Sequence, residues 1–366
     1  MKDKKFVNKI ISKITIITSI TTAITLIIYG INKIINHVAG KISIQEELTS
    51  IIKLPVEKHS YNWRLGKVNY QISGSGTPLL LLHDLSCESS SDDFLPVVNE
   101  LAKHHKLYVL DLPGCGKSEK QKISYTNYFY VQFLTDFIEN VIKQKTVVSG
   151  HSNGALIAAY VAAYGGEMVK GVVLEDPPIF STQGENWENS FAYLDTYKPL
   201  HDYISSEQTE CWPAYYLRHC YWGKLFMKDA MPKIANYAQR YSEKHPGEEV
   251  KIFFLPSSIT CVFHYVNQYD MKYGEHFYDL TWNNGIQHEQ MLSDIKIPCI
   301  YLHAKEEVAE NGVYLCAASG EQAERAAALI GDHCRLMETE NSSHNIHGTH
   351  KQFYLDAINS FLEEGE

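Results

Sequence analysis

Short apolar runs alternate with longer stretches of helical spacing over two parts of this chain, residues 61–177 and 293–366. Short apolar runs between turn residues are typical of buried strands, whereas apolar positions three and four apart are typical of amphipathic helices. Strands are predicted at 67–73, 78–83, 106–112, 145–150, 169–175, 297–303 and 334–339, and helices at 92–104, 127–143, 153–164, 320–330 and 350–363. Alternation of this kind predicts an α/β fold with a mostly parallel central sheet and helices on both faces.

The alternation stops between residues 178 and 292, a segment that is rich in Tyr, Trp, Phe and His and lacks strong strand runs. This segment is too long to be a loop in a compact domain. We therefore expect a mainly helical cap insertion over the sheet, with residues 61–177 and 293–366 forming the core. Residues 42–60 are interpreted as a linker that leads into the core.

The N-terminal segment has a different pattern, because residues 14–31 form an uncharged, largely apolar run of 18 residues. At a rise of about 1.5 Å per residue, such a helix nearly crosses the roughly 30 Å hydrocarbon core of a bilayer. Residues 1–41 are therefore predicted to be a single-pass membrane anchor with a transmembrane helix; a cleaved signal peptide is the alternative. Lysines are concentrated before the run, which predicts a cytoplasmic N-terminus and an extracytoplasmic body at the cell membrane.

Charge is unevenly distributed along the 366 residues. The formal net charge is −10, but residues 1–41 hold seven Lys and one Asp, so residues 42–366 hold 26 basic and 42 acidic residues. A body with this excess of acidic residues repels phosphate backbones. We therefore expect no nucleic-acid partner.

The strongest local motif is G-x-S-x-G at residues 150–154, which read GHSNG. An apolar run precedes it and a helical pattern follows it. In this context the two glycines leave room for a strained strand-to-helix turn, which lifts the hydroxyl of Ser152 above the carboxyl end of the sheet. The following helix offers free backbone N–H groups at its start. The motif predicts that Ser152 is a nucleophile.

Three further motifs occur in the order typical of one family. Residues 79–85 (LLLLHDL) end an apolar run in His-Asp, residues 111–118 (DLPGCGKS) fit the loop pattern D-x-x-G-x-G-x-S, and residues 342–344 (SSH) precede the last predicted helix. With the G-x-S-x-G turn, they make residues 60–366 resemble the α/β-hydrolase superfamily, in its serine hydrolase branch. The resemblance implies a triad of Ser, His and an acid, with no cofactor.

The resemblance assigns the catalytic base to His344, which lies between the last predicted strand and the last predicted helix. The acid that orients this base has two candidates. Asp176 directly follows the predicted strand next to that of Ser152. Glu307 follows a later strand, where most of the superfamily carries its acid. We favour Asp176, because its short side chain at a strand end can reach the histidine loop.

Two other histidines lie close enough to His344 in the sequence to be mistaken for the catalytic base. The chain has 17 His, and both His347 and His350 lie close to His344 in the sequence. Their spacing has some likeness to a metal site, but no carboxylate motif such as H-E-x-x-H accompanies it. We therefore expect no metal ion.

The oxyanion hole is expected to consist of the backbone N–H groups of Leu85 and Asn153. The chain departs from the family pattern at Asp84, which stands in the place of the usual Gly. A carboxylate that pointed inward would oppose a developing oxyanion. We therefore expect the side chain of Asp84 to point away from the site.

These features predict hydrolysis of an ester-like bond in a small or lipid-like apolar substrate, as in carboxylesterases and lipases. Carbon–carbon bond hydrolysis, lyase and thioesterase chemistry use the same triad and remain alternatives. A membrane-tethered binding protein that has a hydrolase fold but no catalysis is the rival hypothesis from another class.

Overall fold

The computed structural model describes residues 56–86, 90–248, 250, 269–340 and 342–364. The predicted membrane anchor at residues 1–41 and residues 42–55 of the predicted linker lie outside the described residues. Within the described ranges, no helix combines the length and the apolar character that crossing a bilayer requires.

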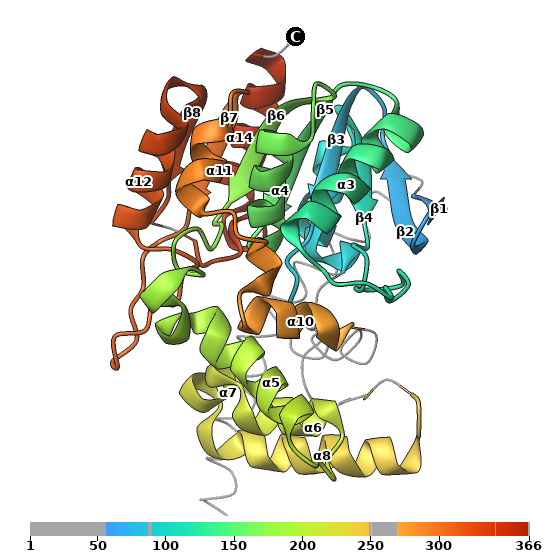
Figure 1. Cartoon of the computed structure of the whole chain (residues 1–366), viewed down its shortest axis with the longest axis vertical. Helices are drawn as coiled ribbons and strands as arrows, with labels where there is room; N and C mark the ends of the chain where they lie inside the picture. The colour runs from blue at the N-terminus through green and yellow to red at the C-terminus, as the bar shows by residue number, and fades with distance from the viewer. Residues whose placement is uncertain (1–55, 87–89, 249, 251–268, 341, 365–366) are drawn as a thin grey trace, which may run out of the picture.

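In the described part of the chain, an eight-stranded sheet forms the centre of the molecule (Figure 1). The strand order is β1-β2-β4-β3-β5-β6-β7-β8, in which β2 pairs antiparallel with β1 and β4, and every other neighbouring pair is parallel. The strands are β1 (Glu57–Trp63), β2 (Gly66–Ser73), β3 (Thr77–Leu82), β4 (His105–Leu110), β5 (Thr146–His151), β6 (Val169–Glu175), β7 (Cys299–His303) and β8 (Cys334–Glu338). The predicted mostly parallel sheet is confirmed, and the seven predicted strands correspond to β2–β8.

Strand β1 lies largely within residues 42–60, which the sequence pattern assigned to a linker. It pairs with β2 along its whole length, from Glu57 opposite Ile72 to Trp63 opposite Gly66. Its sequence, EKHSYNW, lacks an apolar run because this strand is at the edge of the sheet and most of its side chains are exposed or half-buried. A polar edge strand of this kind gives no signal of burial, although polar edges are a common way to limit aggregation.

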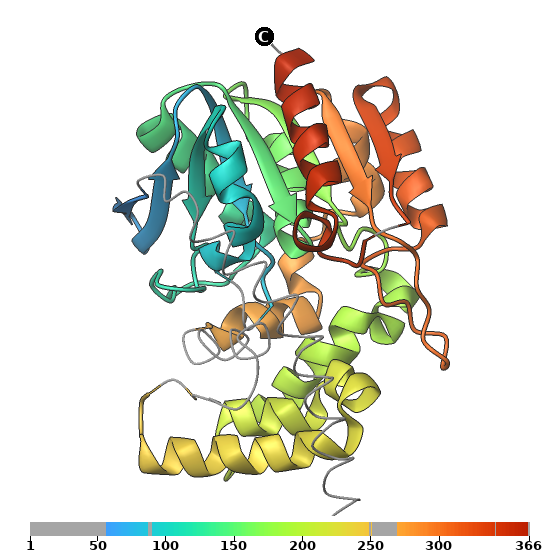
Figure 2. The same ribbon diagram turned by 180° about the vertical axis from the view of Figure 1, so that it is seen from behind.

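Helices cover both faces of the sheet (Figures 1 and 2). Alternate leucines of β3 show the division, because Leu80 and Leu82 pack in one core cluster and Leu79 and Leu81 in the other. The first cluster includes residues of α3, α4, α11 and α12, and the second includes residues of α2 and α14. These helices are α2 (Leu95–Leu101), α3 (Asn127–Phe137), α4 (Asn153–Tyr164), α11 (His288–Asp294), α12 (Gly320–Ile330) and α14 (Lys351–Glu364). The predicted helices on both faces are thereby confirmed.

Capping explains why some helix ends fall where the sequence predicts them. The hydroxyl of Ser319 accepts from the backbone of Gln322, whose side chain in turn accepts from the backbone of Ser319, and this capping box starts α12. Thr126 caps α3 by accepting from Phe129. The shorter helices of the core are η1 (Ser91–Phe94), η2 (Ile138–Ile142), η8 (Gly331–His333) and α13 (Ile346–Thr349).

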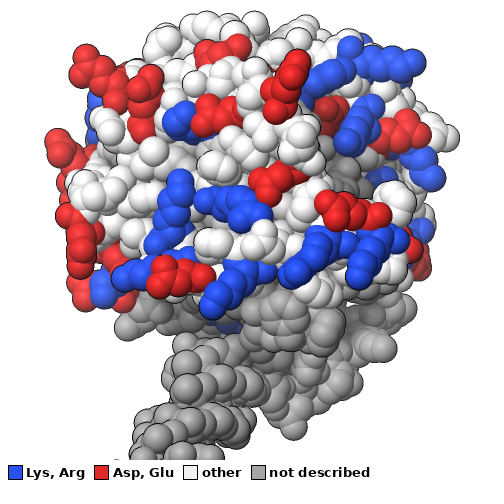
Figure 3. Space-filling model, turned by 90° about the horizontal axis from the view of Figure 1, so that it is seen from below, with Lys and Arg blue, Asp and Glu red and all other residues white. Residues whose placement is uncertain are grey.

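Between β6 and β7 the chain forms a layer of helices below the sheet in Figure 1. The described helices of this segment are η3 (Gly184–Asn189), η4 (Tyr193–Tyr197), α5 (Lys198–Ser205), α6 (Trp212–His219), α7 (Tyr221–Phe226), η5 (Lys228–Ala230), α8 (Met231–Lys244), α10 (Met271–Tyr278) and η7 (Thr281–Asn283). Helix α11, which ends just beyond the predicted cap boundary, packs against α4 and α12 of the core. Seen from the side of this helical layer, Lys and Arg side chains form a band across the molecule (Figure 3).

Candidate active site

The turn between β5 and α4 carries Ser152 in a backbone conformation that few non-glycine residues adopt, with φ 55° and ψ −122°. A Cβ atom at Gly150 would lie 2.3 Å from the carbonyl oxygen of Gly154, and one at Gly154 would lie 2.3 Å from that of Leu82. Only glycine fits at both positions. The predicted strained strand-to-helix turn is therefore present, and it places Ser152 at the start of α4.

Asp176 and His344 meet at the carboxyl end of the sheet, although 168 residues separate them. Nδ1 of His344 lies 2.6 Å from Oδ2 of Asp176, and the carboxylate is fully buried. Burial alone would raise the pKa of Asp176, but hydrogen bonds from His303 and His344 outweigh it and hold the pKa well below its usual value. The carboxylate is therefore ionised and fixes Nδ1 of His344 as the protonated nitrogen.

Glu307, the other candidate acid, lies in an exposed loop. Its backbone carbonyl accepts from Leu315 at 2.7 Å, next to an isolated bridge between Val308 and Tyr314. Among the described side chains, the carboxylate that contacts the ring of His344 is that of Asp176. The geometry favours Asp176 over Glu307.

The expectation that Asp84 points away from the site is wrong. Its Oδ1 accepts from the backbone N–H of Asn153 at 3.3 Å, and its Oδ2 accepts from the backbone of Ser86 at 3.2 Å. The physical reason is the free N–H groups and the positive end of the dipole at the start of α4, which attract an anion. The carboxylate therefore accepts from the N–H of Asn153, one of the two predicted donors to the oxyanion. The other predicted donor is the N–H of Leu85, which follows Asp84 in the chain and is buried.

Two further contacts between a carboxylate and a histidine lie next to His344. Nδ1 of His151 donates to Asp93 at 2.8 Å, and His347 contacts Glu175 through both its backbone N–H, at 2.7 Å, and its ring, at 2.9 Å. The other ring nitrogen of His347 lies 2.8 Å from the backbone oxygen of Asp93, so both nitrogens face acceptors and the ring is protonated. These contacts hold the loop that carries His344 against the turn of Ser152.

Asp93 and His151 predict a measurable dependence of stability on pH. Burial lowers the pKa of His151, but Asp93 and Glu175 outweigh it and raise the pKa to about 10, while the pKa of Asp93 is lowered. The raised pKa of His151 stabilises the fold fully below about pH 6.5, and this contribution is lost as the pH rises toward 10. The lowered pKa of Asp93 contributes above about pH 4 and is lost in acid.

Asp93→Asn should therefore reduce the free energy of unfolding by about 3 kcal/mol near pH 6, because it leaves a buried imidazole without its counter-charge. The difference from the wild type should shrink at pH 9.5. Urea unfolding of both proteins at the two pH values measures it. A difference that is independent of pH would show that the pair acts only through packing.

The three late histidines have separate partners. His344 contacts Asp176, His347 contacts Glu175, and Nδ1 of His350 lies 2.8 Å from the hydroxyl of Thr339. Across the described ranges, no group of three or more His, Cys, Asp or Glu is arranged to hold a metal ion.

Aromatic residues of the helical layer approach the turn of Ser152 through Tyr197. Its hydroxyl accepts from Nδ2 of Asn153 at 2.7 Å, and its ring stacks on Phe277 with 4.7 Å between centroids. Of the tryptophans of the predicted cap, Trp187, Trp212 and Trp282 are buried and Trp222 is exposed. Most of these aromatic side chains therefore form the core of the layer.

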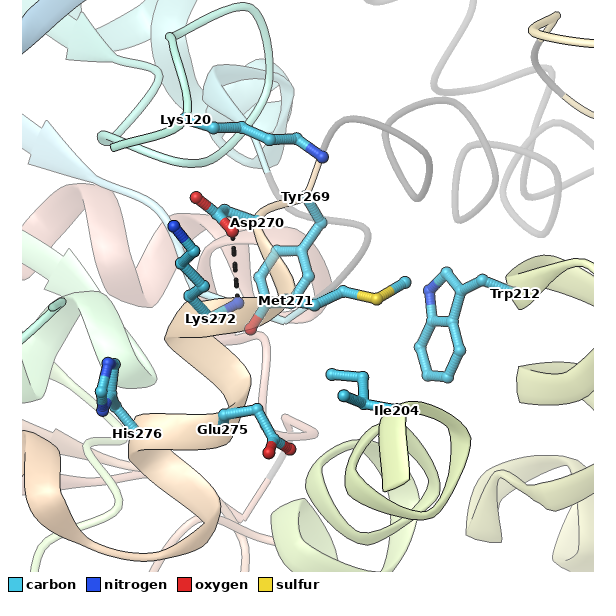
Figure 4. Close-up of a pocket in the computed structure, with 9 residues that line it drawn as sticks. All are labelled: Lys120, Ile204, Trp212, Tyr269, Asp270, Met271, Lys272, Glu275 and His276. Carbon is cyan, nitrogen blue, oxygen red and sulfur yellow. Dashed lines mark hydrogen bonds between the residues drawn. The ribbon is translucent and has the colours of Figure 1, made fainter. Parts of the chain in front are cut away.

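A pocket of about 490 Å³ lies between the loop at Lys120 and the helices α5, α6 and α10 (Figure 4). None of Ser152, His344 and Asp176 lines it. Its lining residues are Lys120, Ile204, Trp212, Tyr269, Asp270, Met271, Lys272, Glu275 and His276. Asp270 caps α10 within the pocket wall by accepting from Lys272 at 3.2 Å, and its other oxygen accepts from Tyr125. The pocket is therefore separate from the turn of Ser152.

Three polar residues of this region were not predicted from the sequence: Asp93, which is half-buried, and Glu175 and His303, which are buried. Glu175 and His303 end the strands β6 and β7, and His303 lies 3.2 Å from Asp176. For Glu175 and His303, the signal that the sequence offers is a charged or polar residue that ends an apolar run. Asp93 follows no apolar run, and the partners of all three residues come from distant segments.

Residues 77–208 match the family model described as alpha/beta hydrolase fold. The chain is 29% identical over 110 residues to a 2-hydroxy-6-oxo-6-(2'-aminophenyl)hexa-2,4-dienoic acid hydrolase of Metapseudomonas resinovorans, covering 30% of this chain and 38% of the relative. It is 30% identical over 114 residues to a pimeloyl-acyl-carrier-protein methyl ester esterase of Pseudoalteromonas atlantica, covering 31% of this chain and 42% of the relative. The chain thus matches about two fifths of the length of these relatives.

Solved structures are similar over a larger part of the chain. A carboxylesterase from Bacillus subtilis is 15% identical and has a TM-score of 0.57, with 89% of this chain and 98% of that chain covered. A membrane phospholipase A is 17% identical and has a TM-score of 0.59, with coverage of 90% and 91%. Together with the family model, these similarities show that the chain has the fold of the α/β-hydrolase superfamily.

Proposed function

We propose that this chain is a serine hydrolase that cleaves an ester-like bond through a triad of Ser152, His344 and Asp176. The contact of 2.6 Å between His344 and the buried carboxylate of Asp176 carries the proposal. It fixes the tautomer in which Nδ1 is protonated, so that Nε2 can accept a proton from a serine hydroxyl. Ser152, in its strained turn, is the serine that the family motif assigns to this role.

In the proposed reaction, the oxygen of Ser152 attacks the carbonyl carbon of the ester while Nε2 of His344 takes the hydroxyl proton. The C–O bond to the leaving alcohol then breaks, and His344 returns the proton to that oxygen. Water hydrolyses the acyl-enzyme by the same steps and regenerates the serine. Asp176 remains ionised and stabilises the imidazolium throughout.

The backbone N–H groups of Leu85 and Asn153 are the proposed donors to the oxyanion. The carboxylate of Asp84 contacts the second of these donors, so it has to leave before a substrate oxygen can bind there. Its negative charge would also oppose the charge that develops on that oxygen.

Asp84→Gly should therefore raise kcat/KM for p-nitrophenyl butyrate by roughly 100-fold, at the lower end of the roughly 100- to 1,000-fold that one donor to an oxyanion contributes. The assay compares this variant with the wild type at equal folded fraction. Asp92→Gly, in the neighbouring 3-10 helix η1, is a control for the loss of an acidic residue near the same loop. A loss of activity in Asp84→Gly would mean that the carboxylate takes part in the reaction.

The proposed substrate is small or lipid-like and largely apolar. Tyr197, Phe277 and Trp187 form a buried aromatic cluster beside Asn153, so the helical layer next to the turn of Ser152 is apolar. One relative is named as a methyl ester esterase, and one structural neighbour as a phospholipase. A series of p-nitrophenyl esters with acyl chains of increasing length tests the preference, which should favour medium chains over acetate.

We also propose that residues 1–41 anchor the chain in the cell membrane, with the body on the extracytoplasmic side. The uncharged run at 14–31 and the lysines before it support this proposal. The full chain should resist extraction by carbonate, whereas a chain that begins at residue 42 should be soluble and active, since the first described strand starts at Glu57. A full chain that fractionates as a soluble protein would contradict the anchor.

A further inference from the structure

The carboxylate of Asp176 contacts a second histidine besides His344. His303 ends β7, and its Nδ1 lies 3.2 Å from Oδ1 of Asp176. Its ring is 3% exposed, so water does not compete for this contact. Because an ionised carboxylate only accepts hydrogen bonds, Nδ1 of His303 must carry a proton and donate it.

Four donors divide evenly between the two oxygens of Asp176. Oδ1 accepts from His303 and from the backbone N–H of Ala304, at 3.2 and 3.3 Å. Oδ2 accepts from His344 and from the backbone N–H of Ala317, at 2.6 and 3.1 Å. Each oxygen therefore has one imidazole and one backbone donor, and rotation of the carboxylate would break all four bonds.

The backbone of Asp176 has an unfavourable conformation directly after β6. Its φ is 41°, in the left-handed region that is unfavourable for a residue with a side chain. Its N–H donates to the carbonyl of Leu302 at 2.8 Å, which extends the contact between β6 and β7 by one residue. The donors to the carboxylate thus come from His303, at the end of β7, and from Ala304 directly after it. The backbone of Asp176 is bonded to the same strand.

We propose that His303 is a positioning residue, which holds Oδ1 of Asp176 so that Oδ2 faces Nδ1 of His344. The proposal rests on the proposed function, in which Asp176 is the acid of the triad. His303 also withdraws part of the carboxylate's negative charge, because its N–H lies against one of the two oxygens. The positive charge that His344 acquires in the reaction is then stabilised less strongly than by an unshared carboxylate.

The other charged groups near His303 are acidic. Glu338 lies opposite His303 on the neighbouring strand β8. Glu306 is close as well, because its Oε2 accepts from the backbone N–H of Gly320, and a Cβ atom at Gly320 would lie 3.9 Å from Nε2 of His303. Burial alone would lower the pKa of His303, but Asp176 and these two carboxylates outweigh burial and raise the pKa. Within the described part of the chain, Nε2 of His303 is buried and has no hydrogen-bond partner. The one polar contact of this ring is therefore with Asp176.

Two substitutions of His303 distinguish the effect of its N–H donor from the effect of its ring. In His303→Asn the amide nitrogen takes the place of Nδ1 and can still donate to Oδ1, whereas His303→Phe keeps a ring of similar size without a donor. His105→Phe is the matched control, because His105 is also a buried strand histidine but contacts Asn359 instead. Its activity should equal that of the wild type.

The measurements are kcat, KM and the pH profile of kcat/KM for p-nitrophenyl butyrate, with the full chain in detergent. His303→Phe should lower kcat by about tenfold with little change in KM, the effect of losing a hydrogen bond to a charged group. It should also move the acid limb of the profile to higher pH, because His344 then faces an unshared carboxylate. His303→Asn should restore most of kcat and move the limb back.

The outcomes keep the two proposals apart. If the wild type reacts with neither the ester nor a fluorophosphonate, the proposed function fails. If the wild type reacts and His303→Phe has the same kcat and the same acid limb, the positioning role fails alone. If His303→Phe does not fold, His303→Asn and His303→Leu are compared, and equal pH profiles for these two variants overturn the inference.

Discussion

Asp176→Asn is expected to lower kcat for ester hydrolysis by roughly three to four orders of magnitude. An asparagine side chain cannot supply the counter-charge that stabilises the imidazolium of His344. It also allows the other tautomer, in which Nδ1 accepts from the amide and Nε2 carries the proton. Nε2 could then no longer accept the proton of Ser152. The rates are compared with those of the wild type at equal folded fraction.

Glu307→Gln is the matched control for this substitution, because it removes the charge of the other candidate acid. Glu307 lies in an exposed loop, so the variant should keep nearly full activity. A large loss in Glu307→Gln together with a near-normal rate in Asp176→Asn would reverse the assignment of the acid.

Ser152→Ala is expected to abolish turnover, with a loss of about 10⁴-fold or more in kcat, because no other group can form the acyl-enzyme. The fold should be retained, since alanine adopts the backbone angles of this turn about as well as serine does. Ester hydrolysis and thermal unfolding of the variant measure the two effects separately.

Ser149→Ala provides the control on the same strand. The hydroxyl of Ser149 is buried and lies 2.9 Å from that of Tyr354, away from the turn. Its loss should reduce stability by about 1 kcal/mol and leave kcat unchanged. Activity that falls equally in both serine variants would point to a general loss of structure.

Features that depend on neighbouring residues could be predicted from the sequence. The turn at Ser152 follows from two glycines that no side chain could replace, and both sit two residues from the serine. Helix α12 starts where its capping box lies and ends before Gly331. By contrast, β1 could not be predicted from hydrophobicity, because an edge strand with a polar exposed face shows no apolar run.

Features that depend on distant segments could not be predicted. The direction of Asp84 is set by the start of α4, and 69 residues separate it from Asn153. Likewise, 127 residues separate His303 from Asp176, and 172 separate His347 from Glu175. The parallel order of β3, β5, β6, β7 and β8 brings the segments that carry these side chains together at the same end of the sheet.

Covalent labelling with a fluorophosphonate probe tests the central proposal most directly. The full chain in detergent is treated with the probe, and the modified residue is identified by mass spectrometry in the wild type and in Ser152→Ala. We predict a single adduct on Ser152 in the wild type and none in the variant. A wild-type chain that is folded but unlabelled, or a chain labelled equally in both forms, would contradict the assignment of Ser152 as the nucleophile of a hydrolase.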